Sequence, residues 1–231
     1  MPEGPEIKRV ATRISKVVVN QTPVEVFFSQ EPLQRYGQIL SGRRVLEVSS
    51  RGKALLTQFE GDLTVYTHNQ LYGRWYVMRA NKFPKTNRTL RFAMHTPTHS
   101  ALLYSASEIH VLDPSQLAHH PYIAKLGPDA LDEQITWRDI LSRLQEKAFH
   151  RRSLAALYLD QKFVAGIGNY LRTEILHKSG LDPFARPCDL TRRQLGLLAR
   201  NTLELSRQAY ATAGITNTPG RVKSLKAAGI T

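Results

Sequence analysis

Hydrophobic positions near the start of the chain follow a helical period, and basic residues lie between them. The apolar positions recur at steps of three and four residues: Ile7, Val10, Ile14 and Val17/Val18. This spacing places the apolar side chains on one face of a helix. The sequence therefore predicts an amphipathic helix over residues 3–19, and Pro2 and Pro5 stand where a first helical turn tolerates proline.

The period changes between residues 22 and 112. Eight short segments in this range are rich in β-branched and aromatic residues and partly alternate apolar with polar positions. Turn signals separate them at Ser41-Gly42, Arg51-Gly52, Gly61-Asp62 and Thr96-Pro97-Thr98. Many short strands in succession predict an antiparallel sandwich or barrel.

After Asp113-Pro114 the pattern is helical again. The helical segments cover residues 136–149, 153–160, 168–180 and 191–211. Thr136 and Thr191 are candidate N-caps, and Gly180 is a candidate C-terminal stop. The final stretch, residues 214–231, is basic and punctuated by Gly and Pro, which predicts a loop or frayed tail.

We therefore expect an α+β protein: an N-terminal helix and an antiparallel β-sandwich, followed by an all-α part. The predicted boundaries are residues 1–124 for the β-sandwich domain, 125–213 for the helical domain and 214–231 for the basic tail. A binding groove is expected between the two domains, because clefts favour domain interfaces.

Charge narrows the classes of partner. The chain has 32 Lys and Arg against 19 Asp and Glu, a net charge of +13 and a pI near 10.1. A protein this basic most often binds a polyanion, usually nucleic acid and more rarely an anionic membrane surface. The alternative is a basic surface that is merely solvated. Charge alone does not distinguish among nucleic-acid binding, membrane binding and such a surface.

The single cysteine, Cys188, excludes an internal disulfide and a zinc site built from several cysteines within this sequence. The start of the chain lacks the apolar region of a signal peptide, and no apolar run is long enough to span a bilayer. We expect an intracellular protein from a reducing compartment, without membrane attachment.

The first residues offer reactive chemistry. If Met1 is removed, the secondary amine of Pro2 becomes the N-terminus, and its attack on an aldehyde-level carbon gives an iminium that promotes elimination. Glu3 would lie beside the reacting carbon as a proton donor or relay. Taken alone, the same residues are better explained as an ordinary helix start.

Two predicted turns carry candidate functional side chains. Lys53 follows Arg51-Gly52 in a hairpin-type turn, and in isolation it reads as a solvated lysine. Gln70, Leu71 and Tyr72 lie between two predicted strands. Their apolar members either fold back into the core or act as a wedge that fills the space of a base flipped out of DNA.

The segment "AGIGNYL" (165–171) lacks the third glycine of a dinucleotide-binding fingerprint. It predicts a tight turn between two helices, with Asn169 opening the second one. The exposed N–H groups of that helix start are suited to a phosphate.

Four motifs together resemble the endonuclease VIII branch of the formamidopyrimidine-DNA glycosylase family. They are "MPEGPEI" at the start, "SSRGKALLTQF" (49–59), "YTHNQLYGRW" (66–75) and "LDQKFVAGIGNYLRTEIL" (159–176). The resemblance runs from Met1 to about Ala213, and Gly4 favours this branch over the purine-acting one. It implies a helix-two-turn-helix motif in the helical domain.

The resemblance also implies roles for single residues. Pro2 is the implied nucleophile, Glu3 the acid/base, and Lys53 a proton donor in strand cleavage. Gln70, Leu71 and Tyr72 are the implied wedge. Asn169, and on a weaker match Lys125, are implied to contact the DNA backbone.

The family normally ends in a four-cysteine zinc hairpin, whereas this sequence has only Cys188. We expect no metal or other cofactor in this chain, and one zinc ion only in a longer form that carries the hairpin. Truncation is the favoured explanation.

The resulting hypothesis is a monomeric bifunctional DNA glycosylase and AP lyase that excises oxidised pyrimidines from double-stranded DNA. A purine-acting glycosylase of the sister branch, a non-catalytic damaged-DNA-binding protein and a basic RNA-binding protein are the alternatives. Comparing excision from duplexes with an oxidised pyrimidine or an oxidised purine distinguishes the main hypothesis from the purine-acting alternative. Borohydride trapping on an abasic duplex distinguishes an enzyme from a non-catalytic binding protein.

Overall fold

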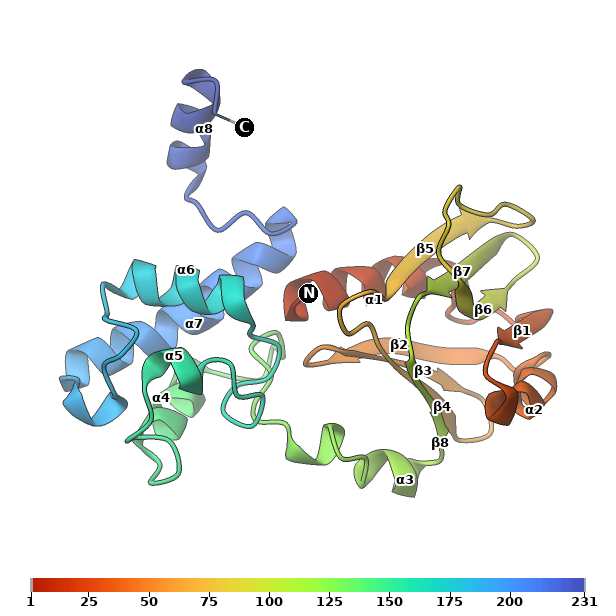
Figure 1. The fold of residues 1–231 in the computed structure, drawn as a ribbon, viewed down its shortest axis with the longest axis horizontal. Helices are drawn as coiled ribbons and strands as arrows, with labels where there is room; N and C mark the ends of the chain where they lie inside the picture. The colour runs from red at the N-terminus through yellow and green to blue at the C-terminus, as the bar shows by residue number, and fades with distance from the viewer. Residues whose placement is uncertain (1, 231) are drawn as a thin grey trace.

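A computed structural model of the protein describes residues 2–230. Figure 1 shows two lobes side by side, a β-rich one built from the first part of the chain and a helical one built from the second. Helix α1 (Gly4–Val18) begins next to the helical lobe and runs along the β-rich lobe. The chain therefore starts between the two lobes.

The β-rich lobe is a sandwich of two antiparallel sheets. Within residues 2–230, eight strands form one sheet of order β1-β6-β7-β5 and another of order β2-β3-β4-β8. Their bounds are β1 Glu25–Phe28, β2 Val45–Arg51, β3 Ala54–Phe59, β4 Leu63–His68, β5 Arg74–Arg79, β6 Leu90–His95, β7 His99–Tyr104 and β8 Glu108–Leu112. The predicted sandwich is confirmed.

One apolar core lies between the two sheets and under α1. The helix contributes a stripe at i, i+4, i+7 and i+11, namely Ile7, Ala11, Ile14 and Val18, each at most 3% exposed. Both sheets contribute as well, for example through Phe92 and Phe59, which are fully buried. The helical period seen in the sequence is therefore the contact face of α1.

The helical lobe surrounds a second apolar core, formed by residues between Ala130 and Ala209. Its longest helix, α7, covers Arg192–Thr212. The remaining helices of the described chain are α2 Glu31–Leu40, α3 Pro114–Ala118, η1 Ile123–Lys125, α4 Trp137–Gln145, α5 Leu154–Leu157, α6 Asn169–Ser179, η2 Pro187–Asp189 and α8 Pro219–Ala227. No helix among residues 2–230 is long and apolar enough to cross a membrane.

Helix α1 joins the two lobes through polar contacts. The Lys8 Nζ donates to the Leu131 carbonyl at 2.6 Å, and the Thr12 hydroxyl lies 3.0 Å from the Tyr210 hydroxyl on α7. The Arg9 guanidinium donates to the Tyr210 carbonyl at 3.1 Å. The element that begins at the predicted nucleophile is thereby fixed to both halves.

The caps follow the sequence closely. The Thr191 hydroxyl accepts from the Gln194 N–H, Thr136 precedes α4, and Gly180 closes α6 with a left-handed φ of +62°. Three α-helices, α2, α3 and α8, lie outside the predicted helical segments. Helix α2 interrupts the strand-rich region, and α8 stands where a loop was predicted, because Thr218 caps it and Pro219 begins it. The boundary at residues 124–125 remains a prediction.

Candidate active site

The Glu3 carboxylate is buried at the start of α6. It accepts backbone N–H groups of Gly168 at 2.6 Å, Tyr170 at 2.9 Å and Leu171 at 3.4 Å, and the residue is only 4% exposed. The N-terminus of a helix has free N–H groups and a positive dipole end, so it suits an anion. Glu3 of one lobe thus occupies the anion site of the other.

Local backbone geometry makes this contact possible. A Cβ on Gly168 would lie 2.4 Å from the Glu3 Cδ, so only glycine leaves room for the carboxylate. The Gly4 N–H donates to the Gly166 carbonyl at 2.7 Å, which aligns the two segments. The start of α1 is therefore docked onto the α5–α6 turn by the Glu3 side chain and by a backbone hydrogen bond of the next residue.

Glu6 and Tyr170 support the same position. The Glu6 side chain accepts the Glu3 backbone N–H at 2.9 Å, and its other oxygen accepts the Tyr170 hydroxyl at 2.9 Å. Tyr170 therefore contacts Glu3 through its backbone and Glu6 through its side chain. This arrangement fixes the peptide next to Pro2, which is half-buried.

Burial raises the pKa of the Glu3 carboxyl above its usual value. The N–H groups of Tyr170 and Gly168 and the positive charge of Lys53 act in the opposite direction, without reversing the shift. Glu3 therefore holds its proton to a higher pH than an exposed glutamate does, as a general acid requires.

Lys53 lies in the two-residue turn that joins β2 to β3, with Arg51 paired to Ala54 across the hairpin. The turn needs Gly52, whose φ is +59°. Two groups from the interlobe segment fix it: the Gly52 N–H donates to the Asp129 carboxylate at 2.7 Å, and the Lys53 N–H donates to the Tyr122 hydroxyl at 2.8 Å. The predicted hairpin turn is confirmed, and it is rigid.

The Lys53 side chain is half-buried, and burial lowers the pKa of its ammonium group. The charge of Glu3 acts in the opposite direction. Each charge thus favours the charged form of the other group, although burial determines the direction of both shifts. A lysine with a lowered pKa is a better proton donor and acceptor near neutral pH.

The loop between β4 and β5 exposes its apolar residues. Leu71 is 58% exposed and Tyr72 is 68% exposed, so neither folds back into the core. Gln70 differs: its amide accepts from the Ser107 hydroxyl at 2.9 Å and donates to Glu108 at 2.9 Å. The structure therefore presents two exposed side chains on a loop that is fixed at Gln70, the residue before them.

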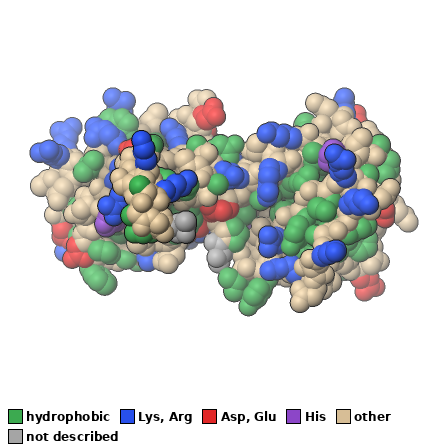
Figure 2. Space-filling view, turned by 90° about the horizontal axis from the view of Figure 1, so that it is seen from above, with side chains coloured by type: hydrophobic (Ala, Val, Ile, Leu, Met, Phe, Trp, Pro, Cys, Tyr) green, Lys and Arg blue, Asp and Glu red, His purple; other side chains and the backbone are tan. Residues whose placement is uncertain are grey.

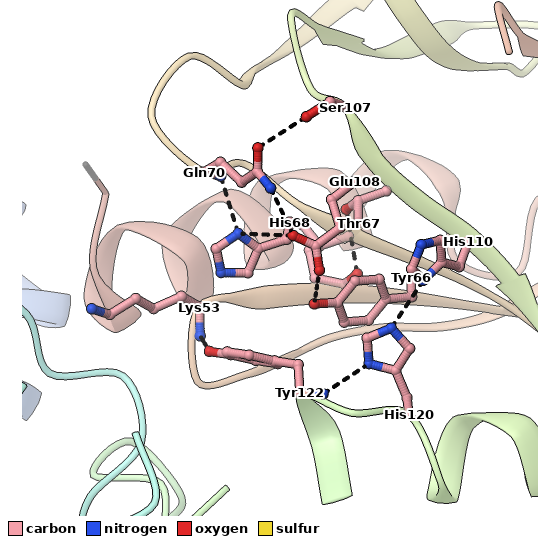
Figure 3. Close-up of polar contacts among 11 residues, drawn as sticks. Lys53, Tyr66, Thr67, His68, Gln70, Ser107, Glu108, His110, His120 and Tyr122 are labelled. Carbon is pink, nitrogen blue, oxygen red and sulfur yellow. Dashed lines mark hydrogen bonds and ion pairs between the residues drawn. The ribbon is translucent and has the colours of Figure 1, made fainter. Parts of the chain in front are cut away.

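A polar network connects this loop to the core of the second sheet (Figure 3). Glu108 accepts the Tyr66 hydroxyl at 3.0 Å and lies 4.0 Å from the His68 ring. The Gln70 N–H donates to that ring at 3.1 Å. Burial lowers the pKa of His68, and the charge of Glu108 partly offsets this effect.

The network continues below Lys53 in Figure 3. The Tyr122 ring lies edge-on to His68, with the ring centres 5.2 Å apart. Its backbone N–H donates to His120, which is 2.9 Å from His110. Burial raises the pKa of Tyr122 to about 12, so it remains a neutral donor and acceptor at physiological pH.

Asn169 and Lys125 are both exposed. Asn169 is the first residue of α6, and its side-chain oxygen accepts from Arg172 at 2.6 Å. Lys125 is the last residue of the short η1 helix, which begins directly after Tyr122. The expectation that the N–H groups at the start of α6 are free for phosphate is wrong, because Glu3 takes those of Gly168, Tyr170 and Leu171.

Comparison with known proteins agrees with this geometry. Residues 1–119 match the model of the formamidopyrimidine-DNA glycosylase N-terminal domain, and residues 126–219 match that of the formamidopyrimidine-DNA glycosylase H2TH domain. The chain belongs to the formamidopyrimidine-DNA glycosylase family. The H2TH match confirms the predicted helix-two-turn-helix motif.

Curated relatives place this glycosylase in the endonuclease VIII branch. Endonuclease 8 of Klebsiella pneumoniae strain 342 is 44% identical over 214 residues, which cover 93% of this chain and 81% of the relative. Endonuclease 8 of Escherichia coli K12/DH10B is 45% identical over 214 residues, which again cover 93% of this chain and 81% of the relative. The chain is accordingly a DNA glycosylase and AP lyase of base excision repair.

Solved structures share the fold. The complex of Lactococcus lactis Fpg with an abasic site containing DNA has a TM-score of 0.78 at 19% identity, over 92% of this chain and 80% of that one. A complex of the wild-type Lactococcus lactis protein with an oxidized pyrimidine containing DNA also has a TM-score of 0.78, at 20% identity, over 93% and 82%.

The zinc hairpin expected of the family has no counterpart in the part of the glycosylase that the structure describes. Cys188 is exposed, and no three His, Cys, Asp or Glu residues within 2–230 are grouped as metal ligands. These residues do not fit a zinc ion, and no step proposed below involves one. Met1, whose removal would free the amine of Pro2, lies outside the described residues.

Sequence reasoning missed the residues that hold the site together. Asp129, Tyr122 and Glu108 each bind a group on another part of the chain, 77, 69 and 38–42 residues away. Only Asp129 had a local signal, in "GPD", where a proline-containing turn carries a carboxylate. Burial raises the pKa of the Asp129 carboxyl, and the N–H groups of Leu131 and Gly52 oppose this effect.

Proposed function

We propose that this glycosylase excises oxidised pyrimidines from duplex DNA through a Schiff base on Pro2, and then nicks the strand by elimination. It acts as a monomer on DNA in the bacterial cytosol and needs no cofactor within residues 1–231. Identity of 43–45% to proteins named Endonuclease 8, over most of both chains, supports the choice of this branch.

One observation carries the proposal. The Glu3 carboxylate is buried directly beside Pro2, on the N-terminus of a helix from the other lobe, and it interacts with the charge of Lys53. An amine, an acid with a raised pKa and a lysine with a lowered pKa are what Schiff-base formation and elimination require. A nearby ammonium group also lowers the pKa of an amine, which favours its nucleophilic form.

In the proposed reaction the Pro2 nitrogen attacks C1′ of the flipped nucleotide. The bond from C1′ to the base breaks, and the base leaves with its electron pair and takes up the proton that the Pro2 nitrogen loses. Glu3 protonates the ring oxygen, the C1′–O bond breaks, and the nitrogen lone pair completes the iminium.

The iminium then acidifies the C2′–H bond. Water takes up that proton, the 3′-phosphate is expelled, and Lys53 supplies the proton that the departing oxygen takes up. The strand is thereby cut on the 3′ side, and hydrolysis of the Schiff base releases the enzyme.

We assign DNA contacts to the remaining predicted residues. Leu71 and Tyr72, with Gln70 behind them, fill the space of the flipped base, which recovers part of its unstacking cost. Asn169 and Lys125 contact the backbone and position the duplex. The exposure of these residues, apart from the anchored amide of Gln70, supports the assignment.

The test is borohydride trapping on a duplex with an abasic site, with protein whose Met1 has been removed. We expect a covalent adduct that mass spectrometry locates on Pro2 and that Pro2→Gly abolishes. Pro32→Gly is the matched control, because this exposed proline lies at the start of α2. Binding without any adduct would favour the non-catalytic alternative.

Lesion choice needs a second measurement. Single-turnover excision is compared on duplexes that differ only in carrying an oxidised pyrimidine or an oxidised purine. We expect faster release of the pyrimidine, and faster release of the purine would move the protein to the substrate class of the sister branch.

A further inference from the structure

Basic side chains form a band across α1 that the catalytic proposal does not use. Arg9, Arg13 and Lys16 lie at i, i+4 and i+7 on the face of α1 opposite its buried stripe. Arg74, the first residue of β5, lies beside the last two. Figure 2 shows Lys and Arg side chains gathered on the side of the β-rich lobe that faces the helical lobe.

The band lines two adjoining hollows in the surface. One, of about 430 Å³, is lined by Arg13, Lys16 and Arg74 together with residues Trp75–Val77. The other, of about 260 Å³, lies between α1 and α7 and is lined by Arg9, Arg13 and Tyr210 among others. Arg13 lines both, so the two hollows adjoin, and together they are called here the α1 groove.

The positive charge of the α1 groove is not neutralised within the described part of the chain. No carboxylate lines either hollow, and Arg13, Lys16 and Arg74 form no ion pair among residues 2–230. Like charges three or four residues apart on a helix repel each other. The Arg74 guanidinium lies over the Tyr76 ring at 5.2 Å, which holds it at the groove wall.

The place of the groove indicates its ligand. Arg74 directly follows the loop of Leu71 and Tyr72, and α1 begins at the proposed nucleophile. Lys16 lies 14 residues beyond Pro2, or about 21 Å along a helix with 1.5 Å per residue. That distance equals roughly six nucleotides of one DNA strand at 3.4 Å each.

We propose that the α1 groove binds the phosphate backbone of the duplex arm that flanks the lesion, about six base pairs from the flipped nucleotide. This inference rests on the proposed function, because it takes the lesion to be at Pro2. Arg13, Lys16 and Arg74 each contact a phosphate there and release the counterions bound to it. The groove lengthens the footprint of the glycosylase without reading sequence.

The test compares two duplexes with a central, uncleavable tetrahydrofuran site, one of roughly 10 base pairs and one of roughly 30, so that only the longer reaches the groove. The variant Arg13→Ala/Lys16→Ala/Arg74→Ala should bind the short duplex as the unmodified protein does. On the long duplex, loss of three phosphate contacts should make the slope of log affinity against log salt shallower by about 2.7. Between 50 and 200 mM salt that equals about a 40-fold smaller loss of affinity.

The matched control is Arg35→Ala/Lys82→Ala/Lys85→Ala, which removes the same charge from exposed positions on α2 and the β5–β6 connection. It should leave the slope on both duplexes unchanged. Replacing Arg13 and Arg74 by Lys keeps the charge and should preserve the slope.

Three results would overturn the proposal: an unchanged slope on the long duplex, an equal change on both duplexes, or an equal change in the control. Borohydride trapping on a short duplex that carries a natural abasic site in place of tetrahydrofuran separates this outcome from failure of the proposed function. An unmodified protein without an adduct refutes the chemistry, whereas a normal adduct with an unchanged slope refutes only the groove.

Discussion

Burial shifts the pKa values of Glu3 and Lys53 in opposite directions. Burial raises the pKa of Glu3 and lowers that of Lys53, because both charged forms lose hydration. Their mutual attraction then reduces each shift. The neutral forms of both groups are therefore populated closer to neutral pH than in an unfolded chain, as proton transfer in both directions requires.

This coupling predicts a change in pH dependence for Lys53→Met. The positive charge of Lys53 lowers the pKa of Glu3, so its removal should raise that pKa further. Because protonated Glu3 opens the sugar ring in the proposed reaction, the alkaline limb of single-turnover Schiff-base formation, measured as the borohydride-trapped adduct, should move to higher pH. Strand cleavage should fall by about 10²- to 10⁴-fold, as for loss of a general acid or base.

Lys85→Met is the control for this measurement, since it removes the same charge from an exposed position. Its profile should match that of the unmodified protein. A limb that moves to lower pH, or does not move, would contradict the coupling between Lys53 and Glu3.

The residues that react were predictable from the sequence, whereas those that hold them were not. Pro2 and Glu3 are neighbours in the chain, and Lys53 follows a recognisable turn. Tyr122 and Asp129 act on that turn from 69 and 77 residues away, and no local pattern indicates such contacts. The N–H groups at the start of α6 were expected to bind phosphate, and instead they bind Glu3. This contact was not predictable from a local pattern because Glu3 and Gly168 are 165 residues apart in the sequence.

At the scale of elements, the β4–β5 connection combines a fixed base with an exposed tip. The Gln70 amide is held by Ser107 and Glu108, while the next two side chains point away from the core. A wedge needs both properties, because a mobile support would lose the contact energy to conformational entropy.

The variant Leu71→Ala/Tyr72→Ala should therefore slow excision from duplex DNA by about 10- to 100-fold, since flipping costs a few kcal/mol. Excision from a single-stranded oligonucleotide should not change, because no base stack is opened there. Thermal stability should stay within about 0.5 kcal/mol, as for other surface changes.

Phe184→Ala serves as the control for the wedge, because Phe184 is 81% exposed in the helical lobe, away from this loop. It should leave excision from both substrates intact. Equal slowing on duplex and single strand by the wedge variant would indicate a role other than filling the stack.

Elements with a large buried face were the predictable ones. The stripe of α1 is a core contact, so its period is visible in the sequence, and the predicted range 3–19 differs little from Gly4–Val18. Helix α2 buries only Gly37 and Leu40, and α8 buries none of its residues. Leu33, Tyr36 and Leu40 of α2 keep a helical period, but Pro32 and Gly37 interrupt it, whereas α8 has little apolar pattern.

At the scale of the whole molecule, the two lobes have separate apolar cores and meet through α1. The Tyr210 ring is the main contact from α7: its hydroxyl lies 3.0 Å from Thr12, and the Lys8 ammonium lies 5.4 Å from its centre. The coupling of the lobes therefore depends on a few side chains.

Tyr210→Ala should weaken this coupling, with the loss of about 1 kcal/mol per hydrogen bond. Calorimetry should then resolve two unfolding transitions, one for each core, in place of a joint one. Tyr210→Phe keeps the ring and should show an intermediate effect. A single, unshifted transition in Tyr210→Ala would show that the lobes are coupled elsewhere.

The docking of Glu3 on α6 has a practical corollary. If the polypeptide were expressed as two fragments cut at the η1 segment, the carboxylate and its three amide donors would reside on different molecules. Neither fragment would then hold the acid in its buried state, and reassembly of the pair would restore it. Such a split pair would report the proximity of any two proteins fused to the fragments, with DNA nicking as the signal.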